Sequence, residues 1–327
     1  MEQKKVLVTG IGGNVGQGII RNIKASDYDI RVIGTNISAF SPGNHLCDAF
    51  YEVPYAYDEN YIPTIQKIIA KEGIDLIIPS TDYESYYLSV NRDQLNCPVA
   101  TSAASTTTIY LDKYETFLHH EKHGIAFAKA TLPSLYKGEY KECILKPKKG
   151  RGSRGLHINP KSWDQFSDEE YMVQDLIRGK EITCAFYVNK QNRLHGMITF
   201  ERELENGATN QCTVIDDYDT QLKKIILQMI EKANFAGAAN LQAIVNEETG
   251  EISPFEINCR ISGTNSIRSN FGFKDVEYTL QEYVYDEMPE YVNTTKGSAV
   301  RILMDVIYRD ATDLTQLKDN SSDFYLF

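Results

Sequence analysis

The first hundred residues alternate short apolar runs with amphipathic stretches, and this order constrains the fold more than any other feature of the chain. The apolar runs 5–9, 31–34 and 74–78 predict strands, and the stretches 15–24 and 61–71 predict the helices between them. Strands that alternate with helices in this way pair in parallel and have both faces covered. This part of the chain therefore predicts a Rossmann-like α/β domain.

From about residue 105 the pattern changes to strands and helices in mixed order, which predicts α+β subdomains. We expect helices near 112–117 and 218–233, and strands at 142–145, 156–158, 181–188, 240–245, 251–258 and 299–306. The chain has 327 residues, more than a single core usually supports, so we expect several packed units. The predicted divisions are 1–104, 105–180 and 181–327.

The composition excludes several classes of protein. A net charge of −11 opposes non-specific attraction to nucleic acid and to anionic membranes. No apolar run has the length of a transmembrane helix, so we expect no membrane partner and a cytoplasmic protein. The six cysteines are widely scattered, and we expect reduced, mostly buried thiols instead of a zinc or redox site.

A glycine motif follows the first strand. Residues 10–18, GIGGNVGQG, can be written as GxGxxG, the pattern of a dinucleotide-binding turn. The acid that binds the ribose of NAD is missing, because the second strand ends in Gly34, Thr35, Asn36 and Ile37. A reductase or epimerase that uses NAD or NADP is thus an alternative, and glycines that let a helix pack close to a strand are the simpler interpretation.

A second glycine motif is strongly basic. Residues 145–156, LKPKKGRGSRGL, place three glycines and five cations between two short strands, so the glycines lie in the bend of a hairpin. The order of residues differs from that of a P-loop. A glycine hairpin can nevertheless cover a polyphosphate, because its N–H groups approach closely and its lysines neutralise charge. The alternative is a solvated basic turn.

Three oxygen-bearing side chains are expected to meet on one hairpin. Gln242 lies in one predicted strand, and Glu256 and Asn258, two residues apart in the next, point to one face. A carboxylate with amide oxygens suits magnesium, which takes the rest of its shell from water and phosphates. Arg260 follows directly and would suit a phosphoryl group or a carboxylate.

Taken together, these motifs resemble the ATP-grasp superfamily, and in particular the single-module relatives of the carbamoyl-phosphate synthase large subunit. The resemblance rests on Lys113, on Lys146 at the start of the glycine hairpin, on residues 173–181 (VQDLIRGKE), and on residues 240–242 with 256–260 (NLQ and EINCR). It spans nearly the whole chain. Cys259 departs from the family, which commonly has proline there, and the chain holds one module where full carbamoyl-phosphate synthases hold two.

The resemblance implies an N-terminal Rossmann-like domain followed by a two-subdomain ATP-grasp fold, with ATP and magnesium between the subdomains. Lys113 and Lys146 would contact the phosphates, and Glu181 the ribose. The remaining implied roles are phosphate cover by Gly150, Gly152, Ser153 and Gly155; an adenine hinge of Gln174, Asp175, Leu176 and Ile177; and magnesium ligation by Gln242, Glu256 and Asn258. Arg260 and Lys146 would act on the transferring phosphoryl group.

The activity implied is that of a carbon–nitrogen ligase, in which ATP converts a carboxylate to an acyl phosphate that an amine then attacks. Arg202 is a candidate for the substrate carboxylate, since it lies in the loop region that faces the acceptor in similar proteins; a surface ion pair is the alternative. Asp82 and Glu84 are candidates for the amine, although a helix cap also explains Asp82. A non-catalytic ATP-binding component of a larger synthase is a further alternative. The expected partners are small-molecule substrates and, because symmetric dimers are common, a second copy of the chain.

Overall fold

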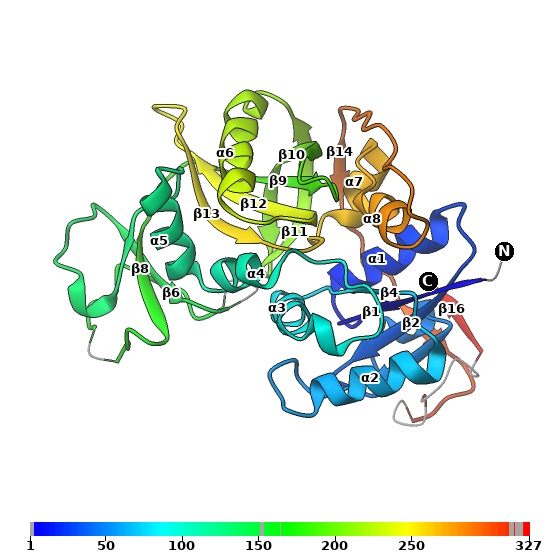
Figure 1. The fold of residues 1–327 in the computed structure, drawn as a ribbon. Coiled ribbons are helices and arrows are strands. Elements are labelled where there is room, and N and C mark those ends of the chain that lie inside the picture. Colours follow the sequence, from blue (N-terminus) through cyan, green and yellow to red (C-terminus); the bar gives the residue numbers. More distant parts are fainter. Residues whose placement is uncertain (1–2, 151–153, 164, 314–316, 318–322) are drawn as a thin grey trace.

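The computed structural model describes residues 3–150, 154–163, 165–313, 317 and 323–327. Its elements form a four-stranded parallel sheet, a four-stranded antiparallel sheet, a six-stranded antiparallel sheet and a C-terminal strand pair. Figure 1 shows the small antiparallel sheet at the left, the six-stranded sheet at the centre and the parallel sheet at the right. Within the described ranges, no helix is long and apolar enough to cross a bilayer.

The parallel sheet has the order β3-β2-β1-β4, and every pairing in it is parallel, as the alternating sequence pattern predicts. Its strands are β1 (Lys4–Val8), β2 (Ile30–Asn36), β3 (Ala49–Glu52) and β4 (Leu76–Ile78). The helices of this region are α1 (Asn14–Ala25), α2 (Tyr61–Glu72) and α3 (Asp82–Val90). Apolar side chains of α2 pack on one face of the sheet, and those of α1 pack on the other.

The small antiparallel sheet carries the basic hairpin. It has the order β5-β8-β6-β7 and consists of β5 (Ala130–Thr131), β6 (Cys143–Pro147), β7 (His157–Ile158) and β8 (Tyr171–Asp175). β6 and β7 pair antiparallel on the two sides of the glycines, so the predicted hairpin is confirmed. Two consecutive helices, α4 (Ala104–Leu111) and α5 (Lys113–His123), connect this sheet to the parallel one.

The largest sheet has the order β13-β12-β9-β10-β11-β14. Its strands are β9 (Lys180–Val188), β10 (Leu194–Glu205), β11 (Ala208–Ile215), β12 (Gly237–Val245), β13 (Ile252–Asn258) and β14 (Ser298–Val300). α6 (Asp219–Lys232) packs its apolar side on one face, while α7 (Asn265–Arg268) and α8 (Asp275–Tyr283) lie on the other. Short 3-10 turns occur at Asn44–Leu46, Arg92–Gln94, Pro133–Leu135 and Ser269–Phe271.

The strand predicted at 299–306 is wrong as a single element. β14 ends at Val300, and a separate strand, β15 (Val306–Tyr308), pairs with β16 (Phe324–Leu326). The chain turns away from the sheet edge at Arg301, whose guanidinium bonds to the carbonyl oxygens of Thr209 and Gly263. The apolar residues that follow leave the sheet, and Leu303 is fully exposed.

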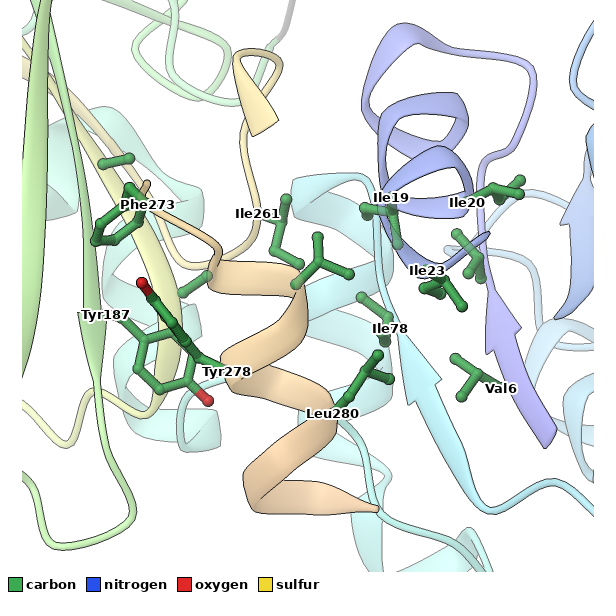
Figure 2. Packing of buried hydrophobic residues seen from close by; sticks show 14 of the residues in the cluster. Val6, Ile19, Ile20, Ile23, Ile78, Tyr187, Ile261, Phe273, Tyr278 and Leu280 are labelled. Carbon is green, nitrogen blue, oxygen red and sulfur yellow. The ribbon is translucent and has the colours of Figure 1, made fainter. Parts of the chain in front are cut away.

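One continuous core joins the parallel sheet to the six-stranded sheet. Figure 2 shows α8 between them, with Leu280 toward Ile78 on one side and Tyr278 beside Tyr187 on the other. The small antiparallel sheet instead has two little clusters of its own, one around Met172 and one around Leu145. The first and last parts of the fold are therefore tied together more extensively than the sheet with the basic hairpin.

Burial also accounts for the cysteines. All six are buried thiols, as expected from their scattered positions. Burial raises the pKa of Cys47 to about 12 and that of Cys97 to about 11. A thiol with so high a pKa is scarcely ionised at neutral pH and is a poor nucleophile or metal ligand.

Candidate active site

A cavity of about 240 Å³ lies between the small antiparallel sheet and the six-stranded sheet. Strands of both sheets line it, together with the first residue of α5. The cavity brings together ten of the residues predicted from the sequence: Lys113, Lys146, Gly150, Gln174, Asp175, Leu176, Ile177, Glu181, Gln242 and Glu256.

The other predicted residues fall into four groups. Gly152 and Ser153 lie outside the described residues. Gly155 has a φ of +70°, which favours glycine, and its neighbours Arg154 and Leu156 reach the cavity wall. Asn258 and Asp82 line a second, much smaller cavity next to the first, whereas Glu84, Arg202 and Arg260 do not line either of the two.

Two lysines enter the main cavity from different elements. Lys113 opens α5, where Asp112 caps the helix by accepting bonds from the N–H groups of Tyr114 and Glu115. The Nζ of Lys113 donates to the Gly150 carbonyl oxygen at 3.1 Å and lies 3.9 Å from Glu256 Oε1. The N-cap thus fixes the start of the helix from which this cation reaches the hairpin.

Lys146 projects from β6 and is only 5% exposed. Its Nζ donates to the Phe255 carbonyl oxygen at 3.1 Å. Burial, together with the neighbouring Lys113 and against a smaller opposing effect of Glu256, lowers the pKa of Lys146 to about 7. An anion placed between the two lysines would reverse this effect, because it would favour the charged ammonium.

The segment predicted as an adenine hinge forms the end of β8 and the residues after it. Gln174 is 2% exposed, and its Nε2 has no hydrogen-bond partner among the residues that the structure describes. A buried amide donor without a partner costs free energy, so a ligand that offers an acceptor to this group would be stabilised in the cavity. Burial raises the pKa of Asp175 beside it.

The three predicted metal ligands meet as expected. Gln242 on β12 is paired with Glu256 on β13, and Asn258 lies two residues further along the same strand. The Asn258 amide donates to Glu256 at 3.2 Å, and the Gln242 amide donates to Asn258 at 3.2 Å. Glu256 is the one carboxylate of this cluster. Within the residues that the structure describes, no three His, Cys, Asp or Glu side chains lie together as a metal site.

Arg202 does not lie in a loop, as the sequence analysis supposed, but within the strand β10. Its guanidinium donates to Glu181 Oε1 at 2.6 Å and to Gln242 Oε1 at 2.5 Å, and its side chain is 11% exposed. The pairing of β10 with β11 explains the difference, because it includes Arg202 and continues past it to Glu205, with a register shift after Glu203. Arg202 therefore links two residues of the cavity wall instead of standing free at the surface.

Sequence reasoning missed the apolar wall of the cavity, to which Ile144, Ile244 and Phe255 belong. A signal for two of them was present. Ile144 lies two residues before Lys146 in β6, and Ile244 lies two residues after Gln242 in β12, so each shares a strand face with a predicted polar residue.

The N-terminal sheet reaches the same region through α3. Thr81 caps this helix by accepting a bond from the Glu84 N–H, and Asp82 is its first residue. Asp82 Oδ2 accepts a bond from Arg260 at 2.7 Å, with the two side chains 23% and 13% exposed. The smaller cavity is lined by Asp82 and Tyr83 on one side and by Lys113, Glu256 and Asn258 on the other.

The N-terminal glycines serve close packing. A Cβ on Gly16 would lie 2.7 Å from the Gly10 carbonyl oxygen, which is too close for any larger residue, and a Cβ on Gly12 would lie 2.9 Å from the Asn36 amide. Asn36, not an acid, ends β2 beside these glycines. The geometry favours the simpler of the two interpretations of GIGGNVGQG.

Two protein-family models match the chain. The N-terminal domain of PylC-like proteins matches residues 6–100, and the ATP-grasp domain matches residues 110–264. The chain therefore carries an ATP-grasp domain over residues 110–264, preceded by a PylC-like N-terminal domain. This ATP-grasp domain contains the two lysines, the β8 segment and the β12–β13 hairpin that line the cavity.

Curated relatives of this ATP-grasp chain match over limited stretches. The carbamoyl phosphate synthase large chain of Methanobrevibacter smithii is 33% identical over 109 residues, which are 33% of this chain and 9% of that protein. The D-aspartate ligase of Enterococcus faecium is 24% identical over 136 residues, which are 39% of this chain and 32% of that protein. The chain thus spans at most about a third of the length of these relatives.

Solved structures match over almost the whole ATP-grasp chain. N5-carboxyaminoimidazole synthetase from Staphylococcus aureus, complexed with ADP, superposes with a TM-score of 0.75 at 12% identity and covers 92% of this chain and 82% of that one. The biotin carboxylase domain dimer of Hydrogenobacter thermophilus 2-oxoglutarate carboxylase gives a TM-score of 0.70 at 14% identity, with 90% and 73% covered. At such identities the likeness shows the fold, which confirms the predicted Rossmann-like domain followed by an ATP-grasp fold.

Proposed function

We propose that this protein is an ATP- and magnesium-dependent ligase that joins a carboxylate to an amine through an acyl phosphate, releasing ADP and phosphate. The observation that carries the proposal is a cavity with two buried lysines and with Gln242 and Glu256 on its wall, while Asn258 lies beside Glu256 in the adjoining smaller cavity. Buried cations are costly without a counter-charge. A polyphosphate would supply that charge, and the solved structure with ADP supports the choice of nucleotide.

The proposed roles of the cavity residues follow from their positions. Lys113 and Lys146 hold the phosphates, and the Gly150 and Gly155 backbone covers them. Gln174 to Ile177 face the adenine. Glu181 accepts hydrogen bonds from the ribose, and Arg202, which donates to Glu181 and Gln242, holds both of these side chains in place. The role proposed for Arg202 is thus one of positioning and replaces its prediction as a substrate ligand.

The Gln242–Glu256–Asn258 cluster fits magnesium that arrives with a nucleotide. One carboxylate and two amides give hard oxygen ligands, but too little negative charge to hold the ion alone beside two lysines. When both are bound, ATP would supply the phosphoryl group and magnesium would neutralise its charge. The match to a structure with magnesium ADP supports this choice of metal.

Arg260 and Asp82 make up the acceptor side of the proposal. Arg260 lies beyond Asn258 on the same chain segment and would stabilise the transferring phosphoryl group and the acyl phosphate. Asp82, within 2.7 Å of Arg260, would accept a hydrogen bond from the attacking amine. Glu84 is 7% exposed and accepts a hydrogen bond from the Thr81 hydroxyl at 2.8 Å, and we propose no contact between it and the substrate. We also propose that the chain divides into units at residues 1–104, 105–180 and 181–327, and that the protein forms a homodimer.

Thermal unfolding of the intact protein with magnesium ADP, magnesium ATP, magnesium alone, NADH and NADPH tests the proposed function. A ligand at about a hundred times its dissociation constant adds about 2.7 kcal/mol to stability. We expect a clear shift with both adenine nucleotides and none with magnesium alone. Stabilisation by a nicotinamide cofactor, with no response to the adenine nucleotides, would overturn the proposal in favour of the N-terminal glycines.

A further inference from the structure

A row of tyrosines extends from the smaller cavity over the surface of the N-terminal sheet. Tyr83, which lines that cavity, lies in edge contact with Tyr57 at a centroid distance of 6.1 Å. Tyr57 in turn stacks on Tyr55 at 5.2 Å with an interplanar angle of 7°. The two outer rings are 59% and 47% exposed. The tyrosine row is therefore a stepped aromatic surface with its inner end at the candidate active site.

The tyrosine row lies where ligands of parallel sheets usually bind. Tyr55 and Tyr57 belong to the loop between β3 and α2, and Tyr83 belongs to the first turn of α3, directly after β4. Both segments follow the carboxyl ends of parallel strands. In Figure 1 the loop before α2 lies close below α3, on the side of the small antiparallel sheet.

The loop that carries the outer two rings is held in place. Ala56 between them is only 7% exposed, so its burial directs both neighbouring side chains outward. The Asp58 N–H donates to the Tyr55 carbonyl oxygen at 2.9 Å, and the Asp58 carboxylate accepts a bond from the Asn60 N–H at 2.8 Å. Rings fixed in this way lose little further freedom when a ligand stacks on them.

The two segments that carry the row hold charged residues of one sign only. Residues 53–63 and 79–91 contain four acids, Asp58, Glu59, Asp82 and Glu84, and neither lysine nor arginine. Such a surface attracts cations, including protonated amines. The nearest cation that the structure pairs with these acids is Arg260, on the side of Asp82 that faces the β12–β13 hairpin.

We propose that the tyrosine row binds the body of the amine substrate, and that this substrate carries a ring with a flat apolar face. The inference rests on the proposed ligase function and names the class of its acceptor. The ring stacks on Tyr57 and Tyr55, and the amino group extends past Tyr83 to Asp82. A tyrosine face offers large apolar contact area and π-electrons, which suit both aromatic rings and the C–H face of a sugar. A simple aliphatic amine would leave the outer two rings unused.

Ligand-observed NMR titrations on the intact protein with magnesium ADP test the inference without turnover. The probes are tyramine, glucosamine and butylamine, which carry an aromatic ring, a sugar ring and no ring. We expect one of the ring-bearing amines to bind more tightly than butylamine, and the stronger of the two identifies the kind of ring. Equal affinities for all three amines, or no binding by either ring-bearing amine, would overturn the inference.

Variants separate the tyrosine row from general surface effects. Tyr57→Ala removes the ring that touches both neighbours, and we expect about twofold to tenfold weaker binding of the preferred ring-bearing amine. Tyr291→Ala is the matched control, because Tyr291 is 90% exposed and lies outside the row. Equal affinities in the two variants would refute the stacking role. Magnesium ADP stabilisation of the wild-type protein is read separately, so failure of the nucleotide site and failure of the tyrosine row give different results.

Discussion

The replacement Lys146→Met tests whether the buried charge of Lys146 destabilises the folded protein. Burial and Lys113 lower the pKa of Lys146 to about 7 from an unfolded value of 10.5. Between these two values the unfolded chain keeps a proton that the folded protein has released. Stability therefore rises with pH in this window, because the unfolded state binds more protons. Below about pH 7 the full destabilising effect is present.

The magnitude follows from the shift. The slope approaches about 1.4 kcal/mol per pH unit, and integration from about pH 7 to about pH 9 gives a gain of about 2 kcal/mol for the wild-type protein. Methionine has a similar length and no charge, so Lys146→Met lacks this contribution. We expect the variant to be more stable than the wild type near neutral pH, and the difference to shrink by about 2 kcal/mol as the pH rises to about 9.

Urea unfolding at several pH values between about 6 and 9 measures the effect. Lys67→Met, an exposed position on α2, is the control and should run parallel to the wild type. A constant difference between wild type and Lys146→Met across this range would refute the reasoning. With magnesium ADP bound, the phosphate charge should restore the lysine to its cationic form, so the wild-type slope should flatten.

Three further predictions concern the same cavity. Glu256→Ala removes the single carboxylate of the proposed magnesium site. Calorimetry should show that ADP binding no longer depends on magnesium, and thermal unfolding of the ADP-free protein should change little. A retained magnesium effect would place the metal elsewhere. Arg202→Met should weaken ADP binding about tenfold, because Glu181 and Gln242 lose their common donor. Arg202→Lys should recover part of the lost ADP affinity. An effect on substrate affinity alone would instead support the role of Arg202 as a substrate ligand. Gln174→Leu removes a buried donor that has no partner among the described residues. Urea unfolding should therefore show that the ADP-free variant is more stable than the wild type by about 1 kcal/mol, while its ADP binding weakens. A less stable variant would mean that the amide has a partner after all.

Local stereochemistry explains what could be read from the chain alone. Alternation of apolar runs and amphipathic stretches determined the parallel sheet, and the two-residue period of strands placed Glu256 and Asn258 on one face of β13. A short turn between β12 and β13 then brought Gln242 opposite Glu256. The contacts between β12 and β13 join residues close in sequence, and the parallel sheet follows from the order of strands and helices, so periodicity is sufficient to predict both.

Tertiary packing decided the rest. Lys146 meets the Phe255 carbonyl oxygen, 109 residues away, and Asp82 meets Arg260, 178 residues away. Such contacts depend on which sheet faces bury each other, which no local pattern encodes. The same reason explains the failure at 299–306, where the apolar run predicted one strand but the chain leaves the sheet at Arg301. The sequence by itself determined the alternating order of the first region and the residue types that line the cavity, and packing between distant elements determined which groups lost their water and therefore their ordinary pKa.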